Sequence, residues 1–272
     1  LNYAKLSYEI GNSYQSTPAV LMAFIKKYPN NANKSEIERL LIDSYISSRN
    51  YKEALVLLEK NKSPENKLAY QKVTFYRGLE LYTDSNYQEA ANLFEKSLDQ
   101  QKDSKFTARA TFWKGETEYV LDDFKNATLS YKQFQGMAAA KETSEFKNVN
   151  YNIAYSYFKL KEYDQAGNYF QNQIENSKDD KVRFHDSYLR LADCRFVTSK
   201  YTAALEAYNK VIELKSVDAD YAYFQKAICY GFISKNDKKI EELNAFLRLY
   251  PKSDYRDDAY FELGNTYVAD NK

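Results

Sequence analysis

The side chains of this sequence that are best suited to chemistry are one histidine, two cysteines and three pairs of adjacent aspartates. His185 is the single histidine, and Asp186 follows it directly. A hydrolase triad or a zinc site would have to be built around this histidine. The sequence contains neither a G-x-S-x-G nor an H-E-x-x-H motif that would support such a site. We therefore expect His185 to be a surface residue near the start of a helix.

The two cysteines, Cys194 and Cys229, are 35 residues apart. This separation matches the period of a repeat described below, and it places the two residues at the same position of neighbouring helices, about 10 Å apart. A disulfide needs Cα atoms within about 7 Å of each other. We expect two reduced cysteines that act as small apolar core residues, with a redox or metal-binding pair as the alternative.

The aspartate pairs are Asp122–Asp123, Asp179–Asp180 and Asp257–Asp258. Paired carboxylates can serve as the acid and base of a glycosidase, but only where burial raises one pKa. These pairs lie at expected turns or in the first turns of helices, where carboxylates cap free N–H groups and complement the helix dipole. No glycine-rich loop that could hold a phosphate is present. The sequence therefore predicts no catalytic, cofactor-binding or metal-binding residues, and a protein that is not an enzyme.

The composition favours a folded, helical protein. Hydrophobic residues make up 44% and charged residues 28% of the chain, and there are only 7 Gly and 4 Pro, too few for the many turns of a β-rich fold. The 39 Lys and Arg balance 38 Asp and Glu, so we expect no nucleic-acid partner. No apolar stretch approaches the roughly 18–20 residues of a transmembrane helix.

A short phrase recurs along the chain at a nearly constant spacing. It consists of an aromatic residue, an alanine three positions later, and an aromatic residue or leucine four positions after the alanine. Successive alanines are 36, 37, 39 and 38 residues apart, which is the signature of a repeat architecture. The five copies are Tyr51–Ala54–Leu58, Tyr87–Ala90–Phe94, Phe124–Ala127–Tyr131, Tyr163–Ala166–Phe170 and Tyr201–Ala204–Tyr208.

A second small residue precedes each of the last four alanines by 12 positions. Two antiparallel helices can approach closely where side chains are small, while flanking aromatic residues fill the space on either side. Each unit is therefore expected to be a helix, a tight turn and a second helix, with turns near Asn50, Asn86, Asp123, Glu162 and Lys200. The small residues are Gly78, Gly115, Ala154 and Ala192, and the series continues to Ala227 and Gly264.

This pattern resembles the tetratricopeptide repeat family, and the resemblance covers nearly the whole chain. The clearest copy runs from Tyr151 to Phe158 and then from Glu162 to Phe170, with both halves of the family signature in register. The resemblance implies an all-α fold, a right-handed α-solenoid of about seven antiparallel helix pairs plus an unpaired C-terminal helix. We expect a single domain over 1–272, with repeats at 1–31, 35–66, 70–103, 106–143, 146–180, 183–217 and 219–253 and a partial repeat at 255–272.

Several positions depart from the family pattern. Arg77, Lys114 and Lys226 stand where the family has a buried leucine, which a one-residue shift in the register of those first helices would explain. Lys239 replaces the repeat alanine of the seventh unit. The last helix, expected near Asp257–Ala269, carries apolar residues that no second helix covers. We therefore expect the sequence to be a fragment of a longer protein.

The resemblance also implies a groove on the concave face, lined by the first helix of each pair. Aromatic residues there have two possible roles: they pack helix against helix, or they form a dedicated binding surface, since Tyr and Phe offer a large contact area at low entropic cost. Such a groove would hold an extended peptide or a helix of a partner protein. The predicted partner-binding residues are Phe75, Tyr82, Arg109, Phe112, Glu116, Tyr119, Asn148, Tyr151, Tyr155, Phe158, Lys159, Asp186, Asp193, Phe196, Phe224 and Phe232.

Two subclasses of the family can be compared with this chain. Members that bind chaperone C-termini hold the terminal carboxylate with Lys and Asn, and here only Asn265 matches, so we expect no such clamp. The places of the other clamp residues hold Phe75, Leu79, Phe112, Glu116, Tyr151, Tyr155 and Phe224. By contrast, Phe24–Pro29 and Phe246–Tyr255 resemble bacterial envelope members, among them the lipoprotein of the outer-membrane barrel assembly machine and the periplasmic coordinator of the Tol–Pal system. This favours the periplasm or the outer membrane, with the cytoplasm as the alternative.

The function that follows is a non-catalytic scaffold that binds a protein or peptide through the groove. Two alternatives remain open from the sequence. One is a structural module that associates with itself as a homo-oligomer. The other is an accessory domain of a larger enzyme or sensor protein.

Overall fold

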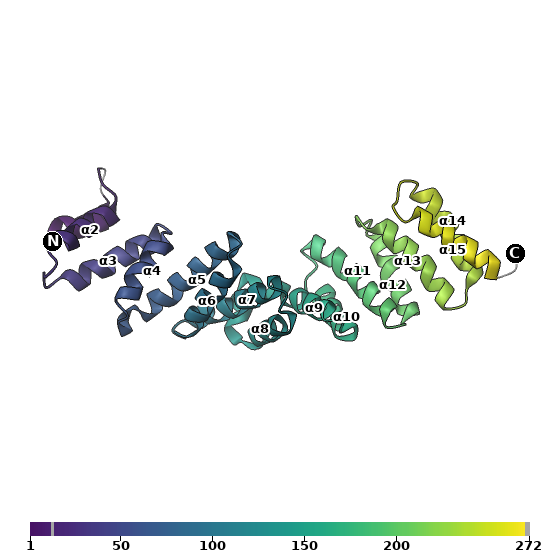
Figure 1. The fold of residues 1–272 in the computed structure, drawn as a ribbon, viewed down its shortest axis with the longest axis horizontal. Coiled ribbons are helices and arrows are strands. Elements are labelled where there is room, and N and C mark those ends of the chain that lie inside the picture. The colour runs from purple at the N-terminus through teal and green to yellow at the C-terminus, as the bar shows by residue number, and fades with distance from the viewer. Residues whose placement is uncertain (12–13, 270–272) are drawn as a thin grey trace. The chain divides into compact units, whose positions relative to one another are not determined.

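The computed structural model describes residues 1–11 and 14–269. In that part of the chain, all regular structure is helical, with fifteen α-helices and three short 3₁₀ helices. They form two compact units, residues 1–143 and residues 144–272. Within each unit, consecutive helices pack against one another in chain order (Figure 1). The predicted all-α fold of sequential helix pairs with one further C-terminal helix is confirmed.

The first unit contains four helix pairs. Its elements are α1 (Asn2–Ile10), α2 (Thr17–Lys27), α3 (Lys34–Ser47), α4 (Tyr51–Lys60), the 3₁₀ helix η1 (Pro64–Asn66), α5 (Lys67–Thr83), α6 (Tyr87–Leu98), α7 (Ser104–Val120), α8 (Phe124–Gly136) and η2 (Ala138–Glu142).

The second unit contains three helix pairs and the last helix. Its elements are η3 (Ser144–Asn148), α9 (Val149–Lys159), α10 (Tyr163–Asn176), α11 (Lys181–Val197), α12 (Tyr201–Glu213), α13 (Ala219–Phe232), α14 (Asn236–Leu249) and α15 (Arg256–Ala269). Residues 12, 13 and 270–272, which belong to the predicted first and last repeats, lie outside the described residues. The single domain over 1–272 and its repeat boundaries stay predictions.

From the α3–α4 pair to the α13–α14 pair, the two helices of each pair are joined by a turn of three residues. The N–H of the third turn residue donates to a carbonyl in the last part of the first helix, as from Asn86 to Leu81 at 2.8 Å. This hydrogen bond, together with a left-handed middle residue, is the usual way to end a helix and reverse the chain. The middle residues, with φ between 57° and 63°, are Arg49, Ser85, Asp122, Lys161, Ser199 and Ser234.

The small residues hold the two helices of a pair close together, as the spacing predicts. A Cβ added to Gly78 would lie 2.7 Å from the ring of Phe94, and one added to Gly115 would lie 2.9 Å from the ring of Tyr131. The repeat alanine of α6, Ala90, is fully buried. Since these contacts join the expected pairs of positions, they establish the register of the first helices.

The one-residue shift in register suggested by three basic residues is therefore wrong. Lys114 pairs with Glu95 at 3.1 Å, and Lys226 pairs with Glu242 at 2.7 Å. Each of these lysines carries its ammonium to a carboxylate on the second helix of a pair, on α6 for Lys114 and on α14 for Lys226. Arg77 pairs with Glu80 on its own helix at 2.8 Å. Long basic side chains thus replace leucine at this position without a change of register.

Candidate functional site

The residues whose side chains are best suited to chemistry do not come together in one place. Cys194 and Cys229 are free and buried, as expected, and burial raises the pKa of each thiol to about 12. A thiol with such a pKa stays protonated and unreactive at neutral pH. His185 is half-buried in α11 and lies beside the ring of Phe184. Among the described residues there is no group of three His, Cys, Asp or Glu side chains that could hold a metal ion.

The aspartate pairs lie at helix starts. Asp123 accepts a hydrogen bond from the N–H of Asn126 at the start of α8, and Asp180 accepts one from the N–H of Arg183 at the start of α11. Asp257 and Asp258 stand in the first turn of α15. Their role as caps and as partners of the helix dipole agrees with the sequence prediction.

Four of the sixteen predicted partner-binding residues are buried. Phe75, Phe112 and Phe224 are 0%, 5% and 7% exposed and pack in the cores of their units, while Asp193 is 8% exposed. In this structure these four side chains offer little surface to a partner, and contact with a partner stays a prediction for them too. Lys159 and Phe232 are exposed, and the other ten side chains are half-buried. Contact with a partner stays a prediction for these twelve.

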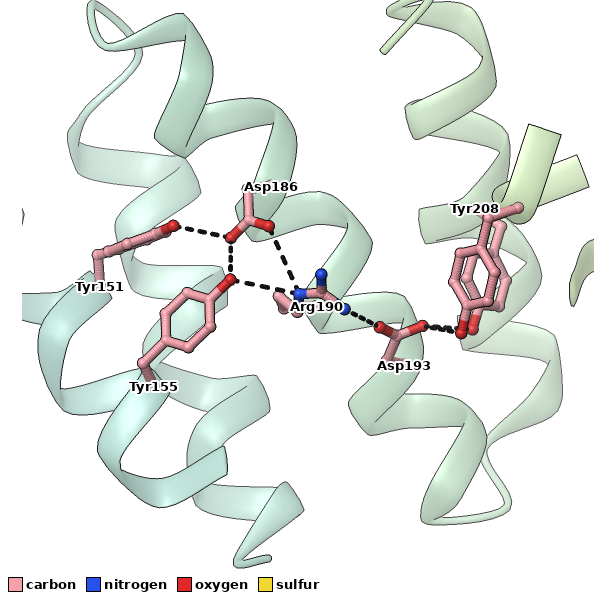
Figure 2. Close-up of polar contacts among 7 residues, drawn as sticks. Tyr151, Tyr155, Asp186, Arg190, Asp193 and Tyr208 are labelled. Carbon is pink, nitrogen blue, oxygen red and sulfur yellow. Dashed lines mark hydrogen bonds and ion pairs between the residues drawn. The ribbon is translucent and has the colours of Figure 1, made fainter. Parts of the chain in front are cut away.

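A hydrogen-bonded network in the second unit brings four of the predicted residues together (Figure 2). Tyr151 and Tyr155 of α9 both donate to Oδ2 of Asp186 on α11, at 2.9 and 2.6 Å. Arg190, one turn further along α11, lies between two carboxylates. Its Nε is 3.4 Å from Oδ1 of Asp186, and its Nη1 is 2.8 Å from Oδ2 of Asp193. The first helices of two neighbouring repeats are thereby joined.

The network continues from Asp193 to the next repeat. Oδ1 of Asp193 accepts hydrogen bonds from Tyr208 of α12 at 2.8 Å and from Tyr221 of α13 at 3.1 Å. Tyr208 is buried, with 1% of its surface exposed, whereas Tyr221 is half-buried. The chain of contacts thus links α9, α11 and α13, the first helices of three consecutive repeats. We call the surface formed by Tyr151, Tyr155, Asp186, Arg190 and Tyr221 the network face.

Burial and nearby carboxylates keep the phenols of the network protonated. Burial, together with the hydrogen bond to Asp186, raises the pKa of Tyr155 to about 12. Burial and the charge of Asp193 raise the pKa values of Tyr208 and Tyr221. Each of these hydroxyls is therefore protonated at neutral pH and donates a hydrogen bond to a carboxylate.

The charged members of the network stabilise one another. Burial opposes the charge of Arg190, but the hydrogen bond with Tyr155 and the two carboxylates raise the pKa of the guanidinium above its usual value. Burial raises the pKa of Asp193, and the hydrogen bond from Tyr208 and the charge of Arg190 oppose this shift. The described network contains neither a free nucleophile nor an imidazole base.

Sequence reasoning missed three members of the network, namely Arg190, Tyr208 and Tyr221. Arg190 lies four residues after Asp186 and three before Asp193, a spacing that places opposite charges side by side on a helix. This signal could have identified it. Tyr208 gave no such signal, because its position in the repeat is held elsewhere by the core residues Phe94 and Phe170.

The first unit has a smaller counterpart of the network. Glu116 and Tyr131 occupy the repeat positions of Asp193 and Tyr208, and the Tyr131 hydroxyl donates to Oε1 of Glu116 at 2.6 Å. Burial, followed by the charge of Glu116, raises the pKa of Tyr82 to about 12. Among the described residues, the network that reaches across three first helices lies in the second unit.

Comparison with known proteins identifies the repeat. Residues 77–142 and 151–219 match the model of a tetratricopeptide repeat. The chain is a tetratricopeptide repeat protein. Such proteins are generally scaffolds for proteins or peptides and are usually non-catalytic. Among curated protein sequences, none is significantly similar to this tetratricopeptide repeat protein.

Solved structures of other tetratricopeptide repeat proteins share the fold at low identity. YrrB, described as a tetratricopeptide repeat protein with an unusual peptide-binding site, is 19% identical with a TM-score of 0.58, over 77% of this chain and 97% of its own. The C-terminal part of a repeat-containing protein from Cytophaga hutchinsonii is 18% identical with a TM-score of 0.57, over 95% and 98%. PilF of Pseudomonas aeruginosa is 17% identical with a TM-score of 0.52, over 84% and 96%.

Some helices of other proteins cross a bilayer, which requires a long apolar stretch. None of the helices among the described residues of this chain combines the length and the apolar character needed to span a membrane.

Proposed function

We propose that this chain is a non-catalytic scaffold that binds a peptide segment of a partner protein across the network face of the second unit. The observation that carries the proposal is the network itself. It holds half-exposed Tyr, Asp and Arg side chains from three consecutive first helices in fixed positions. Side chains that are already ordered lose little entropy when a ligand binds.

The chemistry of the network face suits a peptide. Tyrosine and arginine are the residues that most often dominate binding energy at protein interfaces. Tyr151 and Tyr155 each donate a hydrogen bond to Asp186, and the oxygen of Tyr155 already accepts one from Nε of Arg190 at 3.3 Å. The oxygen of Tyr151 can therefore accept a hydrogen bond from a peptide N–H group. The peptide-binding site of YrrB adds support, since the two chains share a fold.

The test is capture of the partner by variants that separate this face from the rest of α9. Wild-type protein, Tyr155→Ala and the control Tyr157→Ala are crosslinked in lysate of the native host, and captured segments are identified by mass spectrometry and then titrated as synthetic peptides. Tyr157 is on the same helix but stacks on Tyr169 of α10, with ring centroids 5.8 Å apart. We expect Tyr155→Ala to weaken binding of the peptide at least about tenfold, or about 1.4 kcal/mol, and Tyr157→Ala to leave it unchanged. Equal binding by both variants, each shown to be folded, would exclude the network face.

Self-association is a second candidate, favoured by exposed apolar side chains on α15. Tyr260, Phe261 and Val268 are 54%, 67% and 78% exposed, and exposed apolar patches often mark protein contacts. A molar mass that rises with concentration in light scattering, and that returns to the monomer value in Phe261→Ser, would support this function. A constant monomer mass would contradict it.

The proposal also places the protein in the bacterial cell envelope. This location is supported by the resemblance of Phe24–Pro29 and Phe246–Tyr255 to envelope members of the family. Fractionation of the native host tests it: recovery of the protein with periplasmic or outer-membrane markers is expected, and recovery with cytoplasmic markers alone would exclude it.

A further inference from the structure

Four consecutive repeats contain the same pair of aromatic rings at the turn between their helices. One ring lies near the end of the first helix, four residues after the small residue, and the other begins the second helix, three residues before the repeat alanine. The rings meet edge to face, with centroids 5.2 to 5.5 Å apart. The pairs are Tyr82–Tyr87, Tyr119–Phe124, Phe158–Tyr163 and Phe196–Tyr201.

The next repeat, formed by α13 and α14, lacks both rings. Gly231 stands four residues after the small residue Ala227, and Asn236 stands three residues before Lys239. A hollow of about 390 Å³ lies at this place. Its lining residues come from α13, the start of α14, and α15: Ile228, Gly231, Phe232, Asn236, Lys239, Glu262, Asn265, Thr266 and Ala269.

The preceding repeat shows what normally fills this space. Between α11, α12 and α13, the rings of Phe196, Tyr201 and Phe232 form a compact cluster. Phe232 stacks on Tyr201 with a centroid distance of 4.6 Å and an interplanar angle of 7°, and Phe196 meets both rings edge on at 5.5 Å. One repeat later, small or polar side chains replace the rings, and the hollow remains.

The walls of the hollow have distinct chemistry. Phe232, 57% exposed, provides an aromatic wall. The aliphatic stem of Lys239 passes over Gly231, with its Cδ 3.0 Å from where a glycine Cβ would lie, and its ammonium pairs with Glu262 of α15 at 2.5 Å. Asn265 adds a polar group from the same helix. An apolar wall, a fixed cation and polar groups therefore surround one space.

We propose that this hollow binds an aromatic side chain, of the tyrosine type, from a partner peptide. A ring there meets Phe232 with the edge or face geometry that the four ring pairs use. The ammonium of Lys239 complements the negative face of the ring, and the phenol hydroxyl reaches Asn265 or Glu262. The volume lies within the range of small-ligand pockets. The hollow shares no residue with the network face, so either site can fail while the other stands.

The probe for this site is p-cresol, the side chain of tyrosine, titrated into isotope-labelled protein and followed by NMR. The expected result is a saturable shift of the amide signals of Gly231 and Asn236. Cyclohexanol, which has a similar size but no aromatic π electrons, serves as the control ligand. Saturable shifts of equal size with cyclohexanol, or the absence of shifts with p-cresol up to its solubility, would overturn the proposal.

A matched pair of variants tests the position. Asn236→Tyr restores the ring of the repeat and should abolish the p-cresol shift, whereas Asn244→Tyr, on an exposed face of the same helix, should leave it intact. Ala269→Phe, which fills the hollow from its opposite wall, gives the same test if Asn236→Tyr does not fold. Retention of the p-cresol shift in a folded filling variant would show that the probe binds elsewhere and would overturn the proposal.

Discussion

Replacement of Tyr208 by Phe removes one hydroxyl from the centre of the network and leaves the ring in place. The ring is 1% exposed, so its packing is preserved, and the lost hydroxyl donates to Oδ1 of Asp193 at 2.8 Å. A hydrogen bond to a charged group contributes about 1.5–3 kcal/mol. Because Tyr221 still donates to the same oxygen at 3.1 Å, we expect a loss at the lower end, about 1.5 kcal/mol.

Urea unfolding at pH 7, followed by circular dichroism, measures this loss. A cost of about 1.5 kcal/mol corresponds to a decrease of roughly 3–6 °C in the thermal midpoint. The control is Tyr201→Phe on the same helix, because the hydroxyl of Tyr201 donates to Oγ of the exposed Ser199 at 3.3 Å. We expect the control to change the free energy of unfolding by less than about 0.5 kcal/mol. A Tyr208→Phe loss as small as that of the control would refute the reasoning.

The same variant should show a distinctive pH dependence. The pKa of Asp193 is raised in the folded protein, so the folded state binds this proton more readily than the unfolded state does. The contribution of Asp193 to stability therefore falls as pH rises from its unfolded pKa of about 3.9 through its higher folded pKa. Below this interval Asp193 is protonated, and the cost of Tyr208→Phe should be smaller than at pH 7. A cost that does not change with pH would contradict an ionised Asp193.

Three further predictions concern the frame of the repeats. The hydrogen bonds from Tyr70 and then Lys96 lower the pKa of Glu59 to about 2. The contribution of Glu59 to stability is therefore present above its unfolded pKa of about 4.3 and is lost as pH falls toward 2. The difference in thermal midpoint between wild type and Glu59→Gln should disappear over that range, and a constant difference would contradict the shift. Ser199 has a left-handed backbone conformation, which costs less for glycine. Ser199→Gly should therefore raise the free energy of unfolding, measured in urea, by about 0.5–1 kcal/mol. A decrease would show that the added flexibility of the unfolded chain dominates. Gly78→Ala forces a Cβ to within 2.7 Å of a buried ring and should cost about 1–3 kcal/mol; an unchanged midpoint would mean that the helices separate without strain.

The fold could be read from the sequence because it depends on local spacing. Gly78 and Gly115 each lie 12 positions before a repeat alanine, and these two positions mark the contact between the helices of a pair. One short segment of sequence is therefore enough to predict the pair. The turn positions followed from the same spacing. The basic residues such as Lys114 could not be read in the same way, because a lysine stem can cover a helix interface as leucine does, and its carboxylate partner lies on another helix.

The candidate site was only partly readable. Phe75, Phe112 and Phe224 each lie three residues before a small residue, a position that faces the core of the pair, and their aromatic character alone suggested a binding role. Asp193 accepts a hydrogen bond from Tyr221 of the following repeat. The approach of one repeat to the next is set by packing across the inter-repeat connection, and no local pattern in the sequence encodes it.

The three-residue turns decide where this chain can change in length. The connections between repeats vary, from 177–180 to the long segment 137–148 that holds two 3₁₀ helices, while the turns within the described pairs from α3 onward stay the same. An extra residue in a turn would rotate the following helix by about 100° and carry its alanine away from the facing small residue. The period of the repeats therefore varies outside these turns, in the connections between repeats and in the lengths of the helices. A single residue inserted between α11 and α12 should therefore put the two helices of that pair out of phase.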